Sequence, residues 1–422
     1  MGTTSEPIDS APAAGGVAGG AGGDHAPRVG KAARLAAPSR VTRWAISLSA
    51  VRSTILIYLG TRALLLLVAS LDDVLRHHAF NHELANWDGL WYRELAAKGY
   101  PTYISHLPTT LGFFPLYPIA IWAVAHAAPL SDTIANRTFA GVLVSGVGGL
   151  AAAVLVHRLA AGWWGERSGR RAAALFCLFP GSVVFSMAYA EGLMLPLAAG
   201  CILALERRKW ITAGVLAGLA TATEPEALAL IPVCAVSAAL ELRRRGWNGR
   251  GARRSLVAPA LSLTGAVAFA AFLWSWTGTP LASLRAQRYG WHERTDPLAL
   301  VHLARSLARE LSFSHFNHPT INLNLVVGLL GAAILIGGLA LLFRTRREVS
   351  VEALVWTVGI SLLALSSEYT PPNPRLLITA FPAVVVIAHF VRGRRYLWLA
   401  CANAALLAGM SSLTFIGTTL RP

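Results

Sequence analysis

The chain has 422 residues, with 37 Lys and Arg against 21 Asp and Glu, and a formal net charge of +16. Only 14% of the residues are charged and 55% are hydrophobic, whereas soluble domains carry about 25% charged residues. So few charges cannot cover the surface of so apolar a chain, which argues against a soluble enzyme and against a nucleic-acid partner, despite the positive charge. The composition indicates a polytopic membrane protein.

Residues 1–42 differ from the rest of the chain. They are rich in Gly, Ala, Pro and Ser and contain no apolar run, which predicts a disordered tail. The first hydrophobic stretch begins only near residue 45 and no cleavage pattern closes it, so we do not interpret the tail as a secretory signal. We expect this tail in the cytoplasm, followed by one transmembrane domain over residues 43–422.

Apolar runs predict an all-α membrane fold of about eleven transmembrane helices. They lie at about 52–71, 138–160, 172–188, 190–206, 211–224, 226–241, 256–276, 323–343, 350–366, 376–391 and 396–416. Short Arg-rich loops, such as 167–171, 243–254 and 344–347, alternate with segments that are long or nearly devoid of Lys and Arg. The positive-inside rule places the Arg-rich loops and the N-terminus in the cytoplasm, and the C-terminus outside.

Two large outer loops follow from this topology, at about 72–137 and about 277–322. The segment Phe113–Leu130 is apolar enough to span the membrane, but counting it as a span would invert every later basic loop. We therefore interpret it as an interfacial or re-entrant helix of the first outer loop.

Cysteine and histidine give no sign of metal or redox chemistry. The four cysteines lie in apolar runs without a CxxC pair, as small buried hydrophobic residues do. The histidines near residues 77–82 and 315–318 have no carboxylate or cysteine at firm ligand spacing. We expect no metal and no cofactor.

An acidic residue just after the first predicted span is the most informative feature of the sequence. Asp88 begins a predicted short helix over about residues 89–98, which Gly99 closes, and it is flanked by the aromatic residues Trp87, Trp91 and Tyr92. From these residues alone two interpretations stay open: Asp88 caps the helix N-terminus, or it is a general base that faces a lipid-linked substrate. The aromatic residues are equally typical of a membrane-interface belt.

Several motifs in this order carry a family resemblance. They are the run from Trp87 to Tyr100 (WDGLWYRELAAKGY), Phe113–Pro118 (FFPLYP), Phe179-Pro180, Tyr189–Glu191, Pro374-Arg375-Leu-Leu and Phe381-Pro382. Together they resemble the bacterial relatives of the second mannosyltransferase of glycosylphosphatidylinositol synthesis, the PIG-V type, which belongs to the GT-C glycosyltransferases. The resemblance extends over about residues 50–395.

The resemblance implies a GT-C topology with juxtamembrane helices in the first outer loop and a catalytic acid in that loop, where Asp88 lies. It implies transfer of a hexose, with mannose expected, from a polyprenyl-phosphate sugar to a glycolipid, glycan or protein acceptor on the outer face. The lipid-linked sugar is then a co-substrate, and membrane lipids are the other expected partners. Asp88 is the predicted base that deprotonates the acceptor hydroxyl.

Two more charged residues lie on the predicted outer side. Glu191 is in a tight turn, at the place of the family's Tyr-Ser-Glu, although this chain has Ala190 in place of the serine. It is either a solvated turn residue or a second acid that orients the acceptor. Arg375 is the only basic residue between the ninth and tenth predicted spans. Its side chain either extends to the lipid headgroups or binds the phosphate of the lipid carrier, and the resemblance favours binding of the carrier phosphate.

These considerations give a candidate site. Asp88 and Glu191 are the predicted catalytic residues, and the predicted substrate-binding residues are Arg375, Trp87, Trp91, Tyr92, Tyr117 and Tyr189.

Three further candidates are Arg62, Glu224 and Arg288. Arg62, in the middle of the first predicted span, is costly in lipid and should face the bundle interior with a carboxylate or carbonyl partner, an ion pair being favoured. Glu224 precedes Pro225, where relatives more often have Thr-Arg-Pro, so the local charge is reversed. Arg288 lies in the last outer loop among aromatic residues that stack on sugars, although such mixed-charge loops are more often only solvated.

A polyisoprenoid or lipid transporter, or flippase, is the alternative function. Transporters usually show discontinuous helices or polar residues at mid-bilayer, and Arg62 is the main such residue in this sequence. An inactive scaffold that keeps the fold also stays open.

Overall fold

The computed structural model describes residues 48–76, 84–127, 133–249, 251–311, 322–368 and 370–415. These residues are predominantly helical, and the only β-type pairing among them is one isolated bridge between Thr295 and Ser367. The expected all-α class is confirmed for this part of the chain. All of the described residues belong to one compact unit within residues 40–422. The predicted disordered tail at 1–42 lies outside the described residues.

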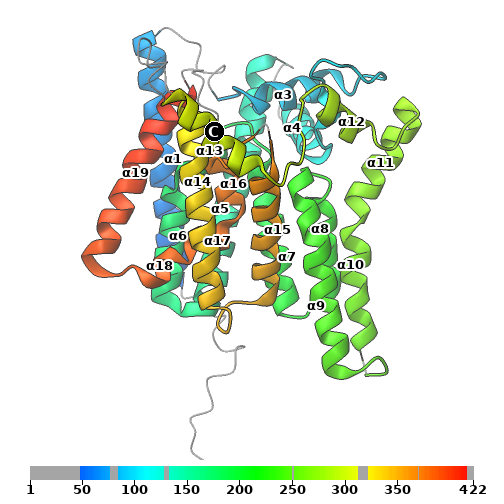
Figure 1. Ribbon diagram of the computed structural model, residues 1–422, viewed down its shortest axis with the longest axis vertical. Helices are drawn as coiled ribbons and strands as arrows, with labels where there is room; N and C mark the ends of the chain where they lie inside the picture. Colours follow the sequence, from blue (N-terminus) through cyan, green and yellow to red (C-terminus); the bar gives the residue numbers. More distant parts are fainter. Residues whose placement is uncertain are drawn as a thin grey trace, which may run out of the picture. The chain divides into compact units, whose positions relative to one another are not determined.

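Six helical segments among the described residues are long and apolar enough to cross a membrane (Figure 1). They lie in α1 (Leu48–Arg76), α5 (Ile134–Trp164), η4 with α9 (Pro225–Ala229, Leu230–Arg245), η5 with α10 and α11 (Ala252–Leu256, Val257–Ser262, Thr264–Thr277), α14 (Leu323–Arg344) and α19 (Gly393–Phe415). A seventh is counted if η3 (Pro180–Ser186) and α7 (Glu191–Glu206), bent by 111°, form one span. The chain is thus built as a multi-pass membrane protein, while the expected count of about eleven is not confirmed.

Several predicted spans are short or broken helices. The run at 350–366 is α15 (Val351–Ser366) and the run at 211–224 is α8 (Trp210–Ala220), both shorter than a span. The run at 172–188 is divided between α6 (Glu166–Leu178) and η3, and the run at 376–391 between α16 (Pro374–Thr379), α17 (Phe381–Val385) and α18 (Ile387–Phe390). Proline accounts for the breaks before η3, α16 and α17, because Pro180, Pro374 and Pro382 each lie in the first turn of one of these helices.

The broken backbone at η3 is held by Arg62 of α1. Its Nη1 donates to Ser182 O at 2.6 Å and to Ser186 Oγ at 3.1 Å, and its Nη2 donates to Ser182 Oγ at 3.0 Å and to Cys177 O at 3.5 Å. Backbone carbonyls freed by a break in a membrane protein need such partners. Arg62 therefore faces the bundle interior, as expected. The favoured ion pair was wrong, because among the described residues no carboxylate pairs with this side chain, and carbonyls and hydroxyls take that place.

Short helices gather at one end of the bundle. Figure 1 shows α3 (Asp88–Lys98), α4 (Leu116–Ala127) and α12 (Ala282–Tyr289) together there, with η2 (Thr110–Gly112) packed on α12, while α13 (Ala299–Glu310) packs on α14. Helix α4 has 12 residues, a length of about 18 Å against a hydrocarbon core of about 30 Å. The described part of the segment Phe113–Leu130, which ends at Ala127, therefore contains no helix long enough to be a candidate span, as the sequence interpretation expects, and its place at the membrane interface stays a prediction.

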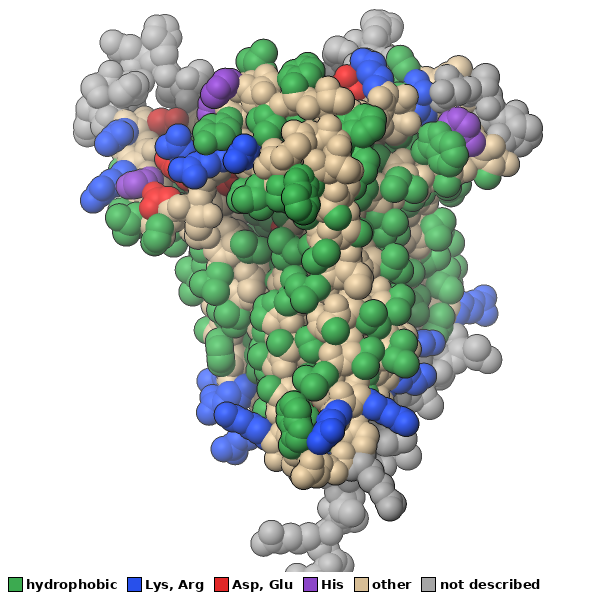
Figure 2. All heavy atoms as spheres, turned by 90° about the vertical axis from the view of Figure 1, so that its right-hand side faces the viewer, with side chains coloured by type: hydrophobic (Ala, Val, Ile, Leu, Met, Phe, Trp, Pro, Cys, Tyr) green, Lys and Arg blue, Asp and Glu red, His purple; other side chains and the backbone are tan. Residues whose placement is uncertain are grey.

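Charge is distributed unequally between the two ends. Figure 2 shows a broad belt of hydrophobic side chains on one face, with only Lys and Arg below it and a mixture of acidic, basic and His side chains above. Many large apolar side chains on the helices are exposed, among them Leu67, Val147, Leu330 and Trp398. Such a belt between two polar ends is what a helical bundle presents to lipid.

Helices α5 and α7 approach each other through small residues. A Cβ atom added to Gly148 would lie 2.0 Å from the carbonyl oxygen of Gly192, and one added to Gly192 would lie 2.4 Å from Cα of Ser145. Only glycine permits so close a crossing, and small residues at the contact are the usual way in which membrane helices come together.

We therefore expect Gly148→Ala to lower the apparent melting temperature of the detergent-purified protein, because overpacking a helix contact costs about 1–3 kcal/mol. Gly60→Ala on α1 is the matched control, since no atom lies within 4 Å of its added Cβ. This control should leave the melting temperature unchanged or raise it slightly, because alanine favours helix more than glycine does. Equal effects of the two substitutions would contradict the tight α5–α7 contact.

Candidate active site

Three charged side chains from distant parts of the chain meet at the end of the bundle that carries α3. Arg375 Nη1 donates to Asp88 Oδ2, and Arg375 Nε lies 3.0 Å from Glu191 Oε1. The side chains are 16% exposed for Arg375, 29% for Asp88 and 4% for Glu191. Burial alone lowers the pKa of Arg375, but Glu191 and Asp88 outweigh it and raise that pKa above its usual range. The guanidinium therefore stays charged between two carboxyl groups.

Asp88 is the first residue of α3, and the preceding backbone is strained. Trp87 has a φ of 61°, in the left-handed region, which costs about 1–3 kcal/mol for a residue other than glycine. No side chain caps the N-terminus of α3, so the capping interpretation of Asp88 was wrong. Its backbone N–H instead donates to Tyr189 Oη at 3.3 Å, and its carboxylate turns to Arg375. Such strain persists only where surrounding contacts fix the backbone.

A buried hydrogen-bond chain holds the turn before Glu191. Ser145 Oγ donates to Tyr189 O at 2.7 Å and accepts from Tyr189 N at 3.2 Å, while Tyr117 Oη lies 2.8 Å from Ser145 Oγ and donates to Gly141 O at 2.9 Å. Tyr117 and Tyr189 are fully buried, and the Arg375 guanidinium lies over the Tyr189 ring at 5.7 Å. Both tyrosines were predicted to bind substrate, and the structure places both beneath the charged cluster.

Arg375 is fixed by the start of α16. Asn373 caps this helix, its Oδ1 accepting from Leu376 N at 2.9 Å, and Pro374 lies in the first turn. The backbone of η3 touches this turn, since a Cβ atom on Gly181 would lie 2.0 Å from Pro374 O. The break at η3 thus makes room for the segment that presents the arginine.

Aromatic rings form one side of the cluster. The Tyr92 ring meets Phe113 and Tyr117 edge to face, at 4.9 Å in each case. Trp91 stacks on Phe113 at 6.2 Å and meets Trp291 of the last predicted outer loop at 5.0 Å. Trp91 is partly exposed beside the cluster, whereas Tyr92 is buried. Trp87 is partly buried and packs against the bundle core.

A further carboxyl group lies next to the aromatic ring of Tyr92. Glu224 is buried, and Tyr92 Oη donates to its Oε1 at 3.3 Å. Burial, and then the neighbouring carboxylates of Glu191 and Glu226, raise the pKa of Glu224 well above its ordinary value. Glu224 therefore belongs to the site's surroundings. By contrast, Arg288 is exposed on α12, and Arg62 lies at η3, so neither joins the cluster.

Reasoning from sequence did not find Ser145 or Asn373, each of which positions a cluster member. Asn373 carries a usable signal, because Asn before Pro and an apolar run is typical of a helix start. Ser145 carries none, being one small polar residue in an apolar helix. Among the described residues no group of three or more His, Cys, Asp or Glu side chains is placed to hold a metal ion.

Residues 54–240 match the family model described as mannosyltransferase (PIG-V). The resemblance to that family is confirmed. The match covers less than half of the chain, and it includes Asp88, Glu191 and Glu224 but not Arg375. No curated protein sequence matches the chain.

Two solved structures match the chain at low sequence identity. ArnT from Cupriavidus metallidurans, bound to undecaprenyl phosphate, has a TM-score of 0.49 and 14% identity over 86% of this chain and 76% of that chain. The oligosaccharyltransferase AglB from Archaeoglobus fulgidus, in complex with an inhibitory peptide and a dolichol-phosphate, has a TM-score of 0.47 and 13% identity over 84% of this chain and 56% of that chain. The chain therefore spans little more than half the length of AglB.

The raised pKa of Glu224 gives a pH prediction. The folded protein keeps this proton at pH values where the unfolded chain, with an ordinary value of 4.5, has lost it, so stability falls as pH rises above that value. We expect the melting temperature of Glu224→Gln, relative to the natural protein, to increase between about pH 5 and about pH 8.

The exposed Glu94 on α3 provides the control for this prediction, since Glu94→Gln should shift the melting temperature by a similar amount at both pH values. A difference between Glu224→Gln and the natural protein that does not change with pH would contradict a protonated, buried Glu224.

Proposed function

We propose that this protein is a membrane glycosyltransferase that transfers a hexose, mannose, from a polyprenyl-phosphate sugar to an acceptor on the extracytoplasmic face. The observation that carries the proposal is the contact of Arg375 with both Asp88 and Glu191, since it joins a base, a second acid and a fixed cation in one place. The family match over residues 54–240 favours mannose as the sugar. The acceptor is a glycolipid, a glycan or a protein.

Asp88 is the base in this proposal because it is the most exposed of the three charged side chains, 29% against 4% for Glu191. A general base must come within hydrogen-bond reach of the acceptor hydroxyl. The hydroxyl proton passes to Asp88 as the acceptor oxygen bonds to the anomeric carbon. The bond from that carbon to the phosphate oxygen breaks, and its electron pair leaves with the polyprenyl phosphate.

Arg375 couples the two ends of this reaction. The carboxylate of Asp88 compensates the guanidinium charge, and Glu191, whose pKa burial raises to about 7 despite the Arg375 charge, adds a second, partial negative charge. When Asp88 accepts the proton, one of these negative charges disappears and the guanidinium becomes available to the negative charge that develops on the leaving phosphate. A preorganised cation at that position is a common source of transition-state stabilisation, and the planar guanidinium suits phosphate oxygens.

Glu191 is the residue that orients the acceptor. Its Oε1 faces Arg375, while its Oε2 is buried and has no hydrogen-bond partner among the described residues. A buried carboxylate oxygen without a donor is costly, so a substrate hydroxyl that donates to it would be bound favourably. No metal and no cofactor takes part in the proposed reaction.

The distribution of Lys and Arg supports an active site on the extracytoplasmic side. The cluster lies at the end of the bundle with α3, and the Arg-rich turns lie at the other end, where Figure 2 shows Lys and Arg but no acidic side chain on the visible face. The positive-inside rule assigns those turns to the cytoplasm, and the cluster then opens to the extracytoplasmic side.

Asp88→Asn tests the proposal directly. Membranes that contain the variant, supplied with radiolabelled polyprenyl-phosphate mannose, should form new glycoside at least about 100-fold more slowly, because loss of a general base costs about 10²–10⁴ in rate. Glu94→Gln is the matched control, an exposed carboxylate on the same helix, and should keep its rate within about twofold.

Transfer by Asp88→Asn at the natural rate would refute the assignment of the base. If the natural protein moved labelled carrier across the membrane without forming any new glycoside, the glycosyltransferase function would be refuted. The alternative function, transport of a polyisoprenoid lipid, would then be favoured.

A further inference from the structure

A cavity of about 630 Å³ lies at the end of the bundle opposite to the charged cluster. It is lined by residues around the α5–α6 turn, including Trp164, Arg167, Arg170 and Arg171, and by Arg392 and Tyr396 before and within α19. Trp164 follows Ser145 by 19 residues on α5, which corresponds to about 28 Å along the helix. The cavity is therefore separate from the proposed active site.

The cavity is lined by positive charge that no lining carboxylate balances. Four of its lining residues are arginines and none is acidic. The nearest carboxylate in sequence, Glu166, is taken by His157, whose Nε2 lies 3.1 Å from Glu166 Oε1. Burial, and then the charge of Arg392, lower the pKa of Arg171, so the two guanidinium groups repel each other. A bound anion would remove that repulsion.

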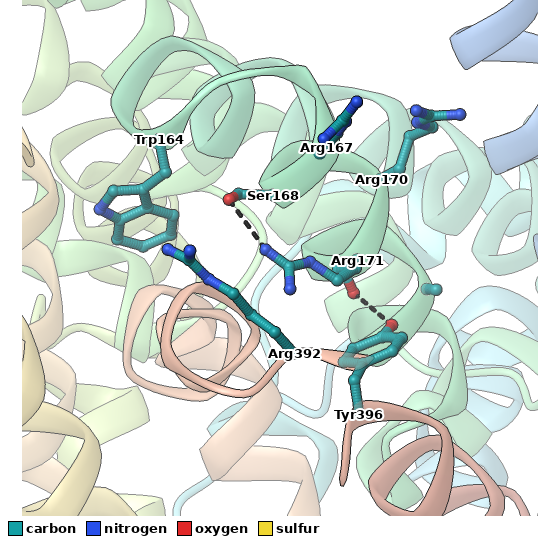
Figure 3. A pocket seen from close by; sticks show the side chains of 8 residues that line it. Trp164, Arg167, Ser168, Arg170, Arg171, Arg392 and Tyr396 are labelled. Atoms are coloured by element: carbon teal, nitrogen blue, oxygen red, sulfur yellow. Dashed lines mark hydrogen bonds between the residues drawn. The ribbon is translucent and has the colours of Figure 1, made fainter. Parts of the chain in front are cut away.

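Hydrogen bonds and a ring contact hold Arg171 in place in the cavity. Arg171 Nη1 donates to Val391 O at 3.1 Å and Nη2 to Ser168 Oγ at 3.2 Å, and its guanidinium lies over the Tyr396 ring at 5.9 Å. Tyr396 Oη donates back to Arg171 O at 2.8 Å. Figure 3 shows the guanidinium groups of Arg171 and Arg392 turned to the same space, next to the Trp164 ring.

Two buried donors of lining residues have no acceptor. Neither Arg171 Nε nor Trp164 Nε1 has a hydrogen-bond partner in the part of the chain that the structure describes. An unsatisfied buried donor costs about 1–3 kcal/mol, so a ligand with acceptor oxygens is favoured there. Phosphate oxygens satisfy such donors and the guanidinium charge together.

The surroundings identify the source of the phosphate. Tyr396 is followed on α19 by Leu397 and Trp398, which are 62% and 75% exposed, and α19 is a candidate membrane span. The cavity thus lies where a span ends, next to apolar surface that faces acyl chains. Basic pockets at such positions bind the headgroups of anionic lipids.

We propose that this cavity binds the phosphate of an anionic phospholipid headgroup, held by Arg171 and Arg392, with Arg167 and Arg170 at its edge. A second cavity, of about 460 Å³, shares Arg392 and adds Arg394 and Arg395, which extends the same positive surface. The proposal does not depend on the proposed catalytic function.

The test uses the full-length protein in a neutral detergent, with bound molecules counted by native mass spectrometry. Three probes are titrated: short-chain phosphatidylglycerol, short-chain phosphatidylcholine and inorganic phosphate. The natural protein should bind phosphatidylglycerol at least about tenfold more tightly than either other probe. The double variant Arg170→Gln with Arg392→Gln, which leaves the bonds of Arg171 in place, should lose about tenfold or more in that affinity.

The matched control removes two charges at the turn between α14 and α15, outside both cavities, as Arg346→Gln with Arg347→Gln, and should bind like the natural protein. Inorganic phosphate binding as tightly as phosphatidylglycerol would overturn the lipid assignment. Equal binding of both lipids, unchanged binding by the double variant, or an equal loss in the control would overturn the site itself. If the double variant does not fold, Arg392→Gln alone, at an exposed side chain, replaces it.

Discussion

One guanidinium group holds the candidate site together. Arg375 meets Asp88, which is 287 residues away in the chain, and Glu191, which begins another helix. Without a cation between them, two carboxylates at this depth would repel each other, and at least one would be driven to its neutral form. Removing the arginine would leave both carboxyl groups without their cation, which for fully buried ion pairs costs about 3–5 kcal/mol. The interaction therefore holds the two carboxyl groups together in one place.

Three features of the fold bring these residues together: the break at η3, the start of α16 and the close crossing of α5 and α7. The break at η3 turns the chain so that Tyr189 and Glu191 face α3, and Arg62 stabilises this break from α1. The same break allows the start of α16 to approach η3 at Gly181, which places Arg375. Small residues let α5 and α7 cross closely enough for Ser145 to hold the backbone of Tyr189. The irregular backbone at η3 thus helps to position the charged side chains of the site.

The candidate residues of the site could be predicted from sequence better than their roles. Asp88, Glu191 and Arg375 were recognisable because charges are rare in this chain and because the motifs around them resemble the PIG-V type, while the residues alone left structural roles open. The short helix after Asp88 was predictable from Gly99, and the structure has α3 at Asp88–Lys98. The contacts of Tyr117 and Tyr189 were not predictable, because an aromatic residue near a membrane surface looks the same whether it binds a sugar or supports a turn.

The number of spans was overestimated for a related reason. Hydropathy detects apolar runs but not the breaks that proline introduces into them, as at 172–188 and 376–391. The burial of Glu224 was also invisible, since it depends on Tyr92 from a helix more than 100 residues earlier. Sequence identifies which residues are unusual, and tertiary packing decides what they contact.

A double-mutant cycle of Asp88→Asn and Arg375→Gln, measured as unfolding free energies in detergent, tests the bridging arginine without knowledge of the substrate. We expect the two single changes to be strongly non-additive, with a coupling energy of about 1–3 kcal/mol, because each removes the partner of the other. Effects that add to within about 0.5 kcal/mol would show that Arg375 and Asp88 are not joined, and the proposed site would then have no structural basis.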